Sequence, residues 1–408
     1  MKKILKQVLE EIKPEKEKVK EVEEFLKKLN SEIKKHKIKA KAVAGGSYAK
    51  KTWLKGDYDV DIFVKFGMKY RDKDLSRMLA KVLKKFKPET IHGSRDYFWV
   101  KNLIKFEIVP VLDIKKAEQA QNVTDFSPRH VKWVNTKGKK YKDDIRLAKR
   151  FMKVNGVYGA ESYIHGFSGH VVDILVIYYK GFMPMLRAAA KWKPKVIIDP
   201  TGKIGRKAPL VLNKSKIQGP LIVIDPVQPD RNAAAAVNKK NFDYFIQCAK
   251  KFLKKPAKEF FEYKKFDKDY FKKKGKLLMV EVDVPEGKED PTGAKLMKAY
   301  HFIRKKLKDF EPIEGGWSWD KQKKATFGYV LKKDRLPATY ERQGPPAEMK
   351  EAVKEFKKAH KKTKTKKGHI TAEIKHKHRN LKKYLEKEVF PSEYMKDKVK
   401  KCRIKSLS

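Results

Sequence analysis

The stretch YDVDIFVKF, residues 58–66, constrains the fold more than any other part of the sequence. Asp59 and Asp61 alternate there with apolar, β-prone residues. Successive side chains of a strand point to opposite faces, so the two carboxylates share one face. Neighbouring carboxylates repel each other unless they bind a cation or share a proton. The stretch therefore predicts a strand with a cation-binding pair, and a solvent-facing acidic edge strand is the alternative.

A small turn, GGS at residues 45–47, precedes this strand. Gly45 and Gly46 allow the backbone to approach a ligand closely, and Ser47 adds a hydroxyl group. Such a turn can hold phosphates through its N–H groups. Oxygen ligands without His or Cys nearby favour Mg²⁺ over zinc, and Mn²⁺ is the alternative ion.

Gly-Ser, a helical turn and then Asp-x-Asp on a strand resemble the nucleotidyltransferase fold related to DNA polymerase β. In that fold a third carboxylate on a later strand completes a two-metal site. Glu107, in KFEIVPV, stands alone among apolar neighbours and comes in the right order. Two metal ions about 3.5–4 Å apart stabilise the attacking and the leaving oxygen of an in-line phosphoryl transfer.

The charge of the chain indicates its partner. Lys and Arg number 101 against 50 Asp and Glu, which gives a formal net charge of +51. Such an excess favours a polyanionic partner, most simply nucleic acid. A base-composition bias that inflates lysine is the alternative. With 408 residues, two to four domains are expected at roughly 150 residues per domain.

Cysteine use and hydropathy indicate the compartment. Cys248 and Cys402 are far apart and have the spacing of neither a zinc ribbon nor a disulfide framework. We therefore expect the reducing cytoplasm. No stretch approaches about 18 uncharged apolar residues, so no membrane span is expected. The basic, amphipathic N-terminal residues do not resemble a signal peptide.

Periodicity predicts three parts. Residues 2–36 read as helix with a break at Pro14, and strand patterns then alternate with a helix at 74–86. From residue 141 the pattern is helical, with a buried helix in FSGHVVDILVIYYKGF. The stretch PLIVIDPVQPDRNAAAAV predicts a strand, a turn and the start of a helix.

After residue 262, KLLMVEVDVPE and ATFGYVLKK predict strands around a helix in GAKLMKAYHFIRKKLKDF, the outline of a small RNA-binding α/β sandwich that many folds share. Residues 348–388 are expected to be mostly Lys-rich helix, broken near TKTKKGH.

Further stretches resemble the archaeal, class I CCA-adding enzymes, which are tRNA nucleotidyltransferases. The resemblance runs in order from about residue 40 to about 260, with weaker support to about 346. Its motifs are GGSYAKKTWLKG, YDVDIFVKF, SPRHVKW, DDIRLAKRFMKVNGVYGAE, GFSGHVVDILVIYY, VIDPVQPDRNAAAAV and, weakly, RQGPP.

The resemblance implies an α+β multidomain protein. It would have a polymerase-β-like catalytic head at residues 1–140, a helical neck at 141–260, and an RNA-binding α/β body with a basic tail at 261–408. The implied partners are tRNA, CTP and ATP, with two Mg²⁺ ions. No membrane partner is expected, and the oligomeric state, a homodimer included, stays open.

The resemblance also implies residue roles. Asp59, Asp61 and Glu107 would bind metal. Ser47 and Lys50 would contact the triphosphate, Ser127 and His130 would approach the nucleotide, and Lys149 and Tyr158 would contact phosphate and ribose. Arg231 would help to read the incoming base. Each has an ordinary alternative as a packing, capping or surface residue.

Three positions depart from the family pattern. Glu107 replaces the usual Asp, Lys50 replaces a common Arg and so loses a bidentate fork, and Ser127 replaces Thr. The stretch HGSRDYFWVK fits poorly, and the C-terminal third diverges most. The alternative functions are another RNA nucleotidyltransferase, such as a poly(A) polymerase or an oligoadenylate synthetase, and a catalytically weakened RNA-binding protein.

Overall fold

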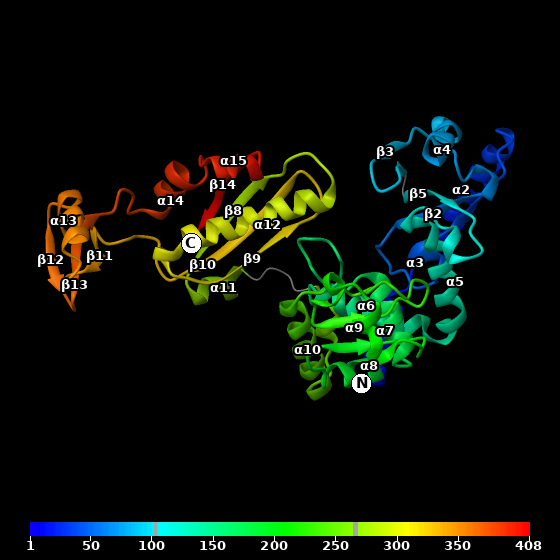
Figure 1. Ribbon diagram of the computed structural model, residues 1–408, viewed down its shortest axis with the longest axis horizontal. Coiled ribbons are helices and arrows are strands. Elements are labelled where there is room, and N and C mark those ends of the chain that lie inside the picture. Colours follow the sequence, from blue (N-terminus) through cyan, green and yellow to red (C-terminus); the bar gives the residue numbers. More distant parts are fainter. Residues whose placement is uncertain (102–103, 264–267) are drawn as a thin grey trace. The chain divides into compact units, whose positions relative to one another are not determined.

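The computed structural model describes residues 1–101, 104–263 and 268–408. The chain divides into two compact units, Met1–Lys264 and Lys265–Ser408. Figure 1 shows the elements of both units. Among the described residues, no helix combines the length and the apolar character that a membrane crossing requires.

The first part of unit 1 is built on a five-stranded sheet with the order β1-β2-β5-β4-β3. Only the β2–β5 pair is parallel, and the predicted strand around Asp59 and Asp61 is confirmed as β2. The elements are α2 (Lys16–Lys35), β1 (Ala40–Ala44), α3 (Gly46–Ala49), β2 (Asp59–Phe66), α4 (Leu75–Leu83), β3 (Glu89–Ile91), β4 (Tyr97–Lys101), β5 (Lys105–Leu112) and α5 (Ser127–Lys137).

The two faces of this sheet are covered differently. Val60, Ile62 and Val64 of β2 pack into the core that holds the apolar faces of α2 and α4. Phe63 and Val109 point to the other face, where Val131 of α5 packs against them. Because side chains alternate along a strand, Asp59, Asp61 and Glu107 share the α5 face.

The second part of unit 1 is mostly helical. Its elements are α6 (Lys142–Val154), α7 (Gly169–Tyr178), α8 (Phe182–Ala189), β6 (Val196–Ile198), α9 (Ala208–Val211), β7 (Leu221–Val223) and α10 (Lys239–Lys254). The buried helix predicted from FSGHVVDILVIYY is confirmed as α7, whose residues 171–176 are all buried. Helix α1 (Lys2–Ile12) belongs to this core, because Val8 and Ile12 pack with α6 and its neighbours.

The expected helix start in NAAAAV is wrong. Residues 233–236 form turns, and α10 begins only at Lys239 after the cap residue Asn238. The cause is Asn232, whose side-chain oxygen accepts hydrogen bonds from the N–H groups of Val223 and Ala234 while its amide nitrogen donates to Leu221. An Asn side chain that bonds nearby backbone competes with helix formation.

Unit 2 contains two antiparallel sheets, ordered β14-β8-β10-β9 and β11-β13-β12. The apolar face of α12 packs on the first sheet. The elements are α11 (Lys268–Lys274), β8 (Lys276–Asp283), α12 (Glu289–Lys306), β9 (Pro312–Trp319), β10 (Lys324–Leu331), β11 (Thr339–Pro346), α13 (Lys350–Ala359), β12 (Thr363–Lys366), β13 (His369–Lys375), α14 (Leu381–Tyr384), α15 (Glu393–Lys398) and β14 (Lys401–Leu407).

The expectation of a mostly helical segment at 348–388 is wrong in its centre. TKTKKGHITAEIK forms the hairpin β12–β13. Its two-residue turn, Lys367 and Gly368, has φ values of 47° and 76°. Two positive φ values are the signature of the tight turns that match strand twist, and Thr and Ile favour the flanking strands.

Candidate active site

The parallel pairing of β2 with β5 builds an acidic edge. Register places Asp61 directly beside Glu107 and Asp59 beside Lys105. Asp59 is exposed, and its Oδ1 lies 2.9 Å from Nζ of Lys105. Glu107 is partly buried, and its Oε2 accepts a 3.0 Å hydrogen bond from the indole nitrogen of Trp99. Two of the three predicted metal ligands, Asp61 and Glu107, are therefore adjacent. The third, Asp59, is the first residue of β2.

The electrostatics of this edge suit a cation. Burial raises the pKa of Asp61 above its ordinary value. Burial and then the charge of Asp61 raise the pKa of Glu107. The surrounding protein groups thus do not fully balance the negative charges of Asp61 and Glu107. Hard carboxylate oxygens with this surplus fit a divalent metal ion.

The turn before β2 lies against Asp61. Gly45 N donates a 2.7 Å hydrogen bond to the carbonyl of Asp61. Gly46 has a φ of +51°, and a Cβ atom there would stand 1.6 Å from Oδ2 of Asp61. Only glycine fits, so this residue sets how closely the turn approaches the carboxylate. Ser47 follows in α3 and is half-buried.

A pocket of about 290 Å³ opens on this edge. It brings together six of the residues predicted from the sequence: Lys50, Asp61, Glu107, Ser127, His130 and Arg231. Thr124 and His170 also line it, with apolar neighbours Phe63, Val109 and Val131. Four predicted residues, Ser47, Asp59, Lys149 and Tyr158, are not among its lining side chains.

Lys50 and Lys149 meet at a fully buried carboxylate that the sequence analysis missed, Asp173 of α7. Nζ of Lys50 donates to Oδ2 of Asp173 at 2.8 Å, and Nζ of Lys149 lies 3.4 Å from Oδ1. Lys149 also donates to the hydroxyl of Thr52 at 2.9 Å. Burial would raise the pKa of Asp173, but Lys149 and Lys50 outweigh it and the pKa is lowered. Burial lowers the pKa of Lys149. With both lysines protonated the cluster carries one net positive charge.

Tyr158 lies beside the start of α7. Burial is the main cause that raises its pKa, and the charge of Asp173 adds to it. A Cβ atom on Gly169 would stand 2.7 Å from the hydroxyl oxygen of Tyr158, so glycine admits the phenol. Nζ of Lys153 lies 5.1 Å from the ring centre.

Asp125 positions helix α5, which carries Ser127 and His130. Its buried carboxylate is paired with Arg95 and accepts a 2.9 Å hydrogen bond from the backbone N–H of Leu112 at the end of β5. The turn before α5 is therefore fastened to the strand that carries Glu107. This explains why Ser127 and His130 face the same pocket as Glu107.

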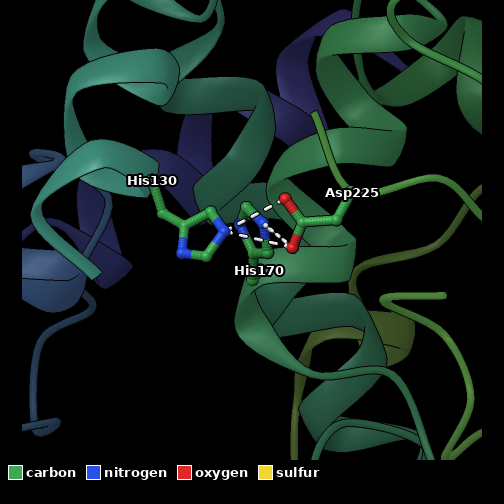
Figure 2. A group of neighbouring side chains, drawn as sticks. All are labelled: His130, His170 and Asp225. Atoms are coloured by element: carbon green, nitrogen blue, oxygen red, sulfur yellow. Dashed lines mark hydrogen bonds and ion pairs between the residues drawn. The ribbon is translucent and has the colours of Figure 1, made fainter. Parts of the chain in front are cut away.

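A second group joins α5, α7 and the loop after β7 (Figure 2). Nε2 of His130 lies 3.0 and 3.1 Å from the two carboxylate oxygens of Asp225, which is fully buried. Nε2 of His170 lies 3.4 Å from Oδ2 of Asp225. Nη1 of Arg231 donates to the same oxygen at 3.2 Å. Burial would raise the pKa of Asp225, but His130 and His170 outweigh it and hold the pKa low.

Two imidazoles and a carboxylate are a donor set that transition metals accept, and the ligand atoms of His130, His170 and Asp225 lie within 4.8 Å of one another. The carboxylate is already saturated, however. Its Oδ1 also accepts from the N–H groups of Val227 at 2.9 Å and Gln228 at 3.2 Å. A metal bound to this carboxylate would have to replace its hydrogen bonds with His130 and Arg231, so this group functions better as a hydrogen-bonded network.

Comparisons with known proteins decide the family. Residues 143–262 match the model of the tRNA nucleotidyltransferase second domain, and residues 1–148 match the Second Messenger Oligonucleotide or Dinucleotide Synthetase domain. The CCA-adding enzyme of Saccharolobus shibatae is 34% identical over 312 residues, covering 75% of this chain and 72% of that enzyme. The chain belongs to the CCA-adding enzyme family.

Other CCA-adding enzymes match as well. That of Nanoarchaeum equitans is 40% identical over 259 residues, which cover 62% of this chain and 64% of the relative. That of Sulfurisphaera tokodaii is 37% identical over 290 residues, which cover 69% and 66%. The chain thus spans just under two thirds of these two relatives.

Solved structures support the fold alone. A cytoplasmic RNA terminal U-transferase matches with a TM-score of 0.51 at 16% identity, covering 65% of this chain and 100% of that one. An RNA terminal uridylyl transferase matches with a TM-score of 0.52 at 14% identity, covering 65% and 98%.

Four site residues of this CCA-adding family member were missed from the sequence: Asp125, His170, Asp173 and Asp225. Asp173 left a signal, because it is the one acid inside an apolar helix pattern and a buried charge needs partners. Asp225 left a similar one in VIDP, directly after a buried strand. The patterns around His170 and Asp125 gave no comparable signal.

Proposed function

We propose that this protein adds C, C and A to the 3′ end of tRNA from CTP and ATP without a nucleic-acid template. The observation that carries the proposal is the pairing of Asp61 with Glu107 in a pocket that also holds His130 and Arg231, within a chain of the CCA-adding family. The 3′-hydroxyl of the RNA attacks the α-phosphorus of the nucleotide, and pyrophosphate leaves.

Asp59, Asp61 and Glu107 are the proposed ligands of two divalent ions, Mg²⁺ with Mn²⁺ as the alternative. When bound, such ions stabilise the charge on the attacking and leaving oxygens. Glu107 carries one methylene more than the usual Asp, and its bond to Trp99 holds the longer side chain in one direction. Lys105 must release Asp59 for it to act as a ligand.

The phosphates are proposed to meet Ser47, Lys50 and Lys149. Asp173 holds both ammonium groups before substrate arrives, so little side-chain entropy is lost on binding. Because Asp173 neutralises only one of the two charges, the pair retains attraction for a triphosphate. Lys149 is 3% exposed, so its proposed contribution is its positive charge, held beside Asp173, and its hydrogen bond to Thr52.

The nucleoside is proposed to meet Ser127, His130, Tyr158 and Arg231. Arg231 has a guanidinium with unused N–H donors and a half-exposed side chain, so it can reach the base edge. Tyr158, whose hydroxyl lies beside Gly169 at the start of α7, is the proposed ribose contact.

Residues 261–408 are proposed to hold tRNA. The net charge of +51 favours RNA phosphates, and A-form RNA is read by shape and phosphate contacts. The division into a head (1–140), a neck (141–260) and a body with tail (261–408) belongs to this proposal, as does action in the cytoplasm.

The test is incubation with tRNA that ends at the discriminator base, CTP, ATP and Mg²⁺, read at single-nucleotide resolution. The expected product ladder stops after CCA, and tRNA already ending in CCA is not extended. A long A-tract would instead support a poly(A) polymerase. No extension at any metal concentration, together with tRNA binding, would support an RNA-binding protein.

A further inference from the structure

Asp225 reaches the pocket only through other residues. It follows β7, is fully buried and is absent from the pocket lining, whereas His130, His170 and Arg231 all line it. These three come from α5, α7 and the loop after β7. One carboxylate thus lies beside three side chains from three separate segments, and Figure 2 shows two of them, His130 and His170.

We infer that Asp225 is a positioning residue for nucleotide selection, which holds His130 and Arg231 in one mutual orientation so that both address the same incoming nucleotide. This inference rests on the proposed function. The inference extends the proposed function by assigning the accuracy of base choice to a residue that does not line the nucleotide pocket.

The hydrogen-bond chemistry of Asp225 determines the state of His130. An ionised carboxylate only accepts hydrogen bonds, so Nε2 of His130 must carry the proton that points to Asp225. In the neutral ring Nδ1 is then an acceptor. A fixed tautomer presents one defined hydrogen-bonding group to a ligand, as second-shell carboxylates do for other histidines.

Asp225 restricts Arg231 in a similar way. The side chain of Arg231 is 48% exposed, and a free Arg loses rotamer entropy when it is fixed. The bond from Nη1 to Oδ2 of Asp225 fixes one nitrogen in advance. The remaining donors of the planar group then point in a set direction.

His170 supports this geometry from behind. Its ring centre lies 4.3 Å from that of His130 with a tilt of 52°, so it blocks one rotation of the His130 ring. Both of its ring nitrogens are buried and make no hydrogen bond in the structure. Its Nε2 lies 3.4 Å from Oδ2 of Asp225, so the ring packs against the carboxylate as well as against His130.

The test replaces Asp225 with Asn, which keeps the shape but presents an amide to the donors. Steady-state kcat/KM is measured for CTP, ATP, UTP and GTP on the same tRNA. We expect discrimination against UTP and GTP to fall about ten- to a hundredfold, the loss typical of a charge-assisted hydrogen bond. The KM for CTP and ATP should rise more than kcat falls, because the metal ligands are untouched.

Asp199→Asn is the matched control. Asp199 follows β6, the strand paired with β7, and its carboxylate also accepts backbone N–H groups, from Thr201 at 2.8 Å and Ile204 at 2.7 Å. It does not line the pocket. The control should lower Tm without changing relative kcat/KM values. If Asp225→Asn behaves like this control, Asp225 only supports its loop and the inference is overturned.

A double-mutant cycle with His130→Gln and Arg231→Ala tests the inference without any change at Asp225. Residues held by one carboxylate should show non-additive effects on discrimination. Additive effects would overturn the inference. If the wild-type protein adds neither C nor A, the proposed function itself fails, which is a different result from wild-type activity with unchanged selectivity in Asp225→Asn.

Discussion

Asp61 on β2 and Asp225 after β7 serve the same pocket in opposite electrical conditions. Burial raises the pKa of Asp61, and a second acid, Glu107, is its register partner on β5. Asp225 receives hydrogen bonds from backbone N–H groups, an imidazole and a guanidinium, and its pKa is lowered. A carboxylate short of donors is suited to recruiting cations, and a saturated one is suited to fixing other side chains.

The comparison predicts that neutralising Asp61 lowers activity while the stability of the fold is kept or raised. Asp61→Asn should reduce nucleotide transfer by about 10³-fold or more, because metal ions supply several kcal/mol of transition-state stabilisation. Its Tm without divalent ions should be unchanged or higher, since repulsion from Glu107 is relieved. Transfer assays, tRNA binding and thermal unfolding measure this, with the exposed Asp72→Asn as control. Equal loss of tRNA binding and activity would mean that Asp61 is structural.

Variants of Glu107 test whether the proposed metal site requires the charge of this side chain or only its shape. Glu107→Gln should lose about 10²-fold in kcat, because the negative charge disappears while the bond from Trp99 can persist. Glu107→Asp should stay within about tenfold of wild type, because it restores the family's usual ligand. Single-turnover rates over a Mg²⁺ titration separate the two variants. A fully active Gln variant would remove Glu107 from the metal site.

Arg231 tests the group around Asp225, where hydrogen-bond donors surround the carboxylate. Arg231→Ala should reduce discrimination against UTP and GTP about ten- to a hundredfold while the affinity for tRNA changes little. Relative kcat/KM values for the four nucleotides measure it, and the exposed Arg187→Ala on α8 is the control. A uniform decline for all four nucleotides would make Arg231 a phosphate or structural contact.

His170, which packs beside Asp225, makes the stability of the fold depend on pH. Burial lowers its pKa from 6.5 to about 4. The unfolded chain therefore takes up a proton as pH falls through 6.5, whereas the folded state does so only near pH 4, and stability is lost between these values. The loss at pH 5.5 relative to pH 7.5 should be about 1.4 kcal/mol. Urea unfolding of wild type and His170→Gln measures it, and equal pH dependence in both would contradict the prediction.

The three acids of the proposed metal site could be predicted from the sequence, because the pattern that marks them is local. Asp59 and Asp61 alternate in one strand, and Glu107 follows in the order that the resemblance implies. The groups around Asp225 and Asp173 depend on contacts between distant segments. In the sequence, 95 positions separate His130 from Asp225, and 123 separate Lys50 from Asp173. No periodicity reports such pairings. The helix expected in NAAAAV failed for a different reason, because Asn232 makes short-range hydrogen bonds to the backbone of β7 that compete with helix formation.

Helix α1 has a consequence for the order of folding during synthesis. Val8 and Ile12 are buried among residues of α6 and later helices, which the ribosome makes more than a hundred positions afterwards. At about 5–20 residues per second, the apolar face of α1 waits several seconds or longer for its partners. During that interval it is a natural site for a chaperone. A fragment that ends before α6 would keep this face exposed, so the sheet of β1–β5 with α1 is a poor unit for expression.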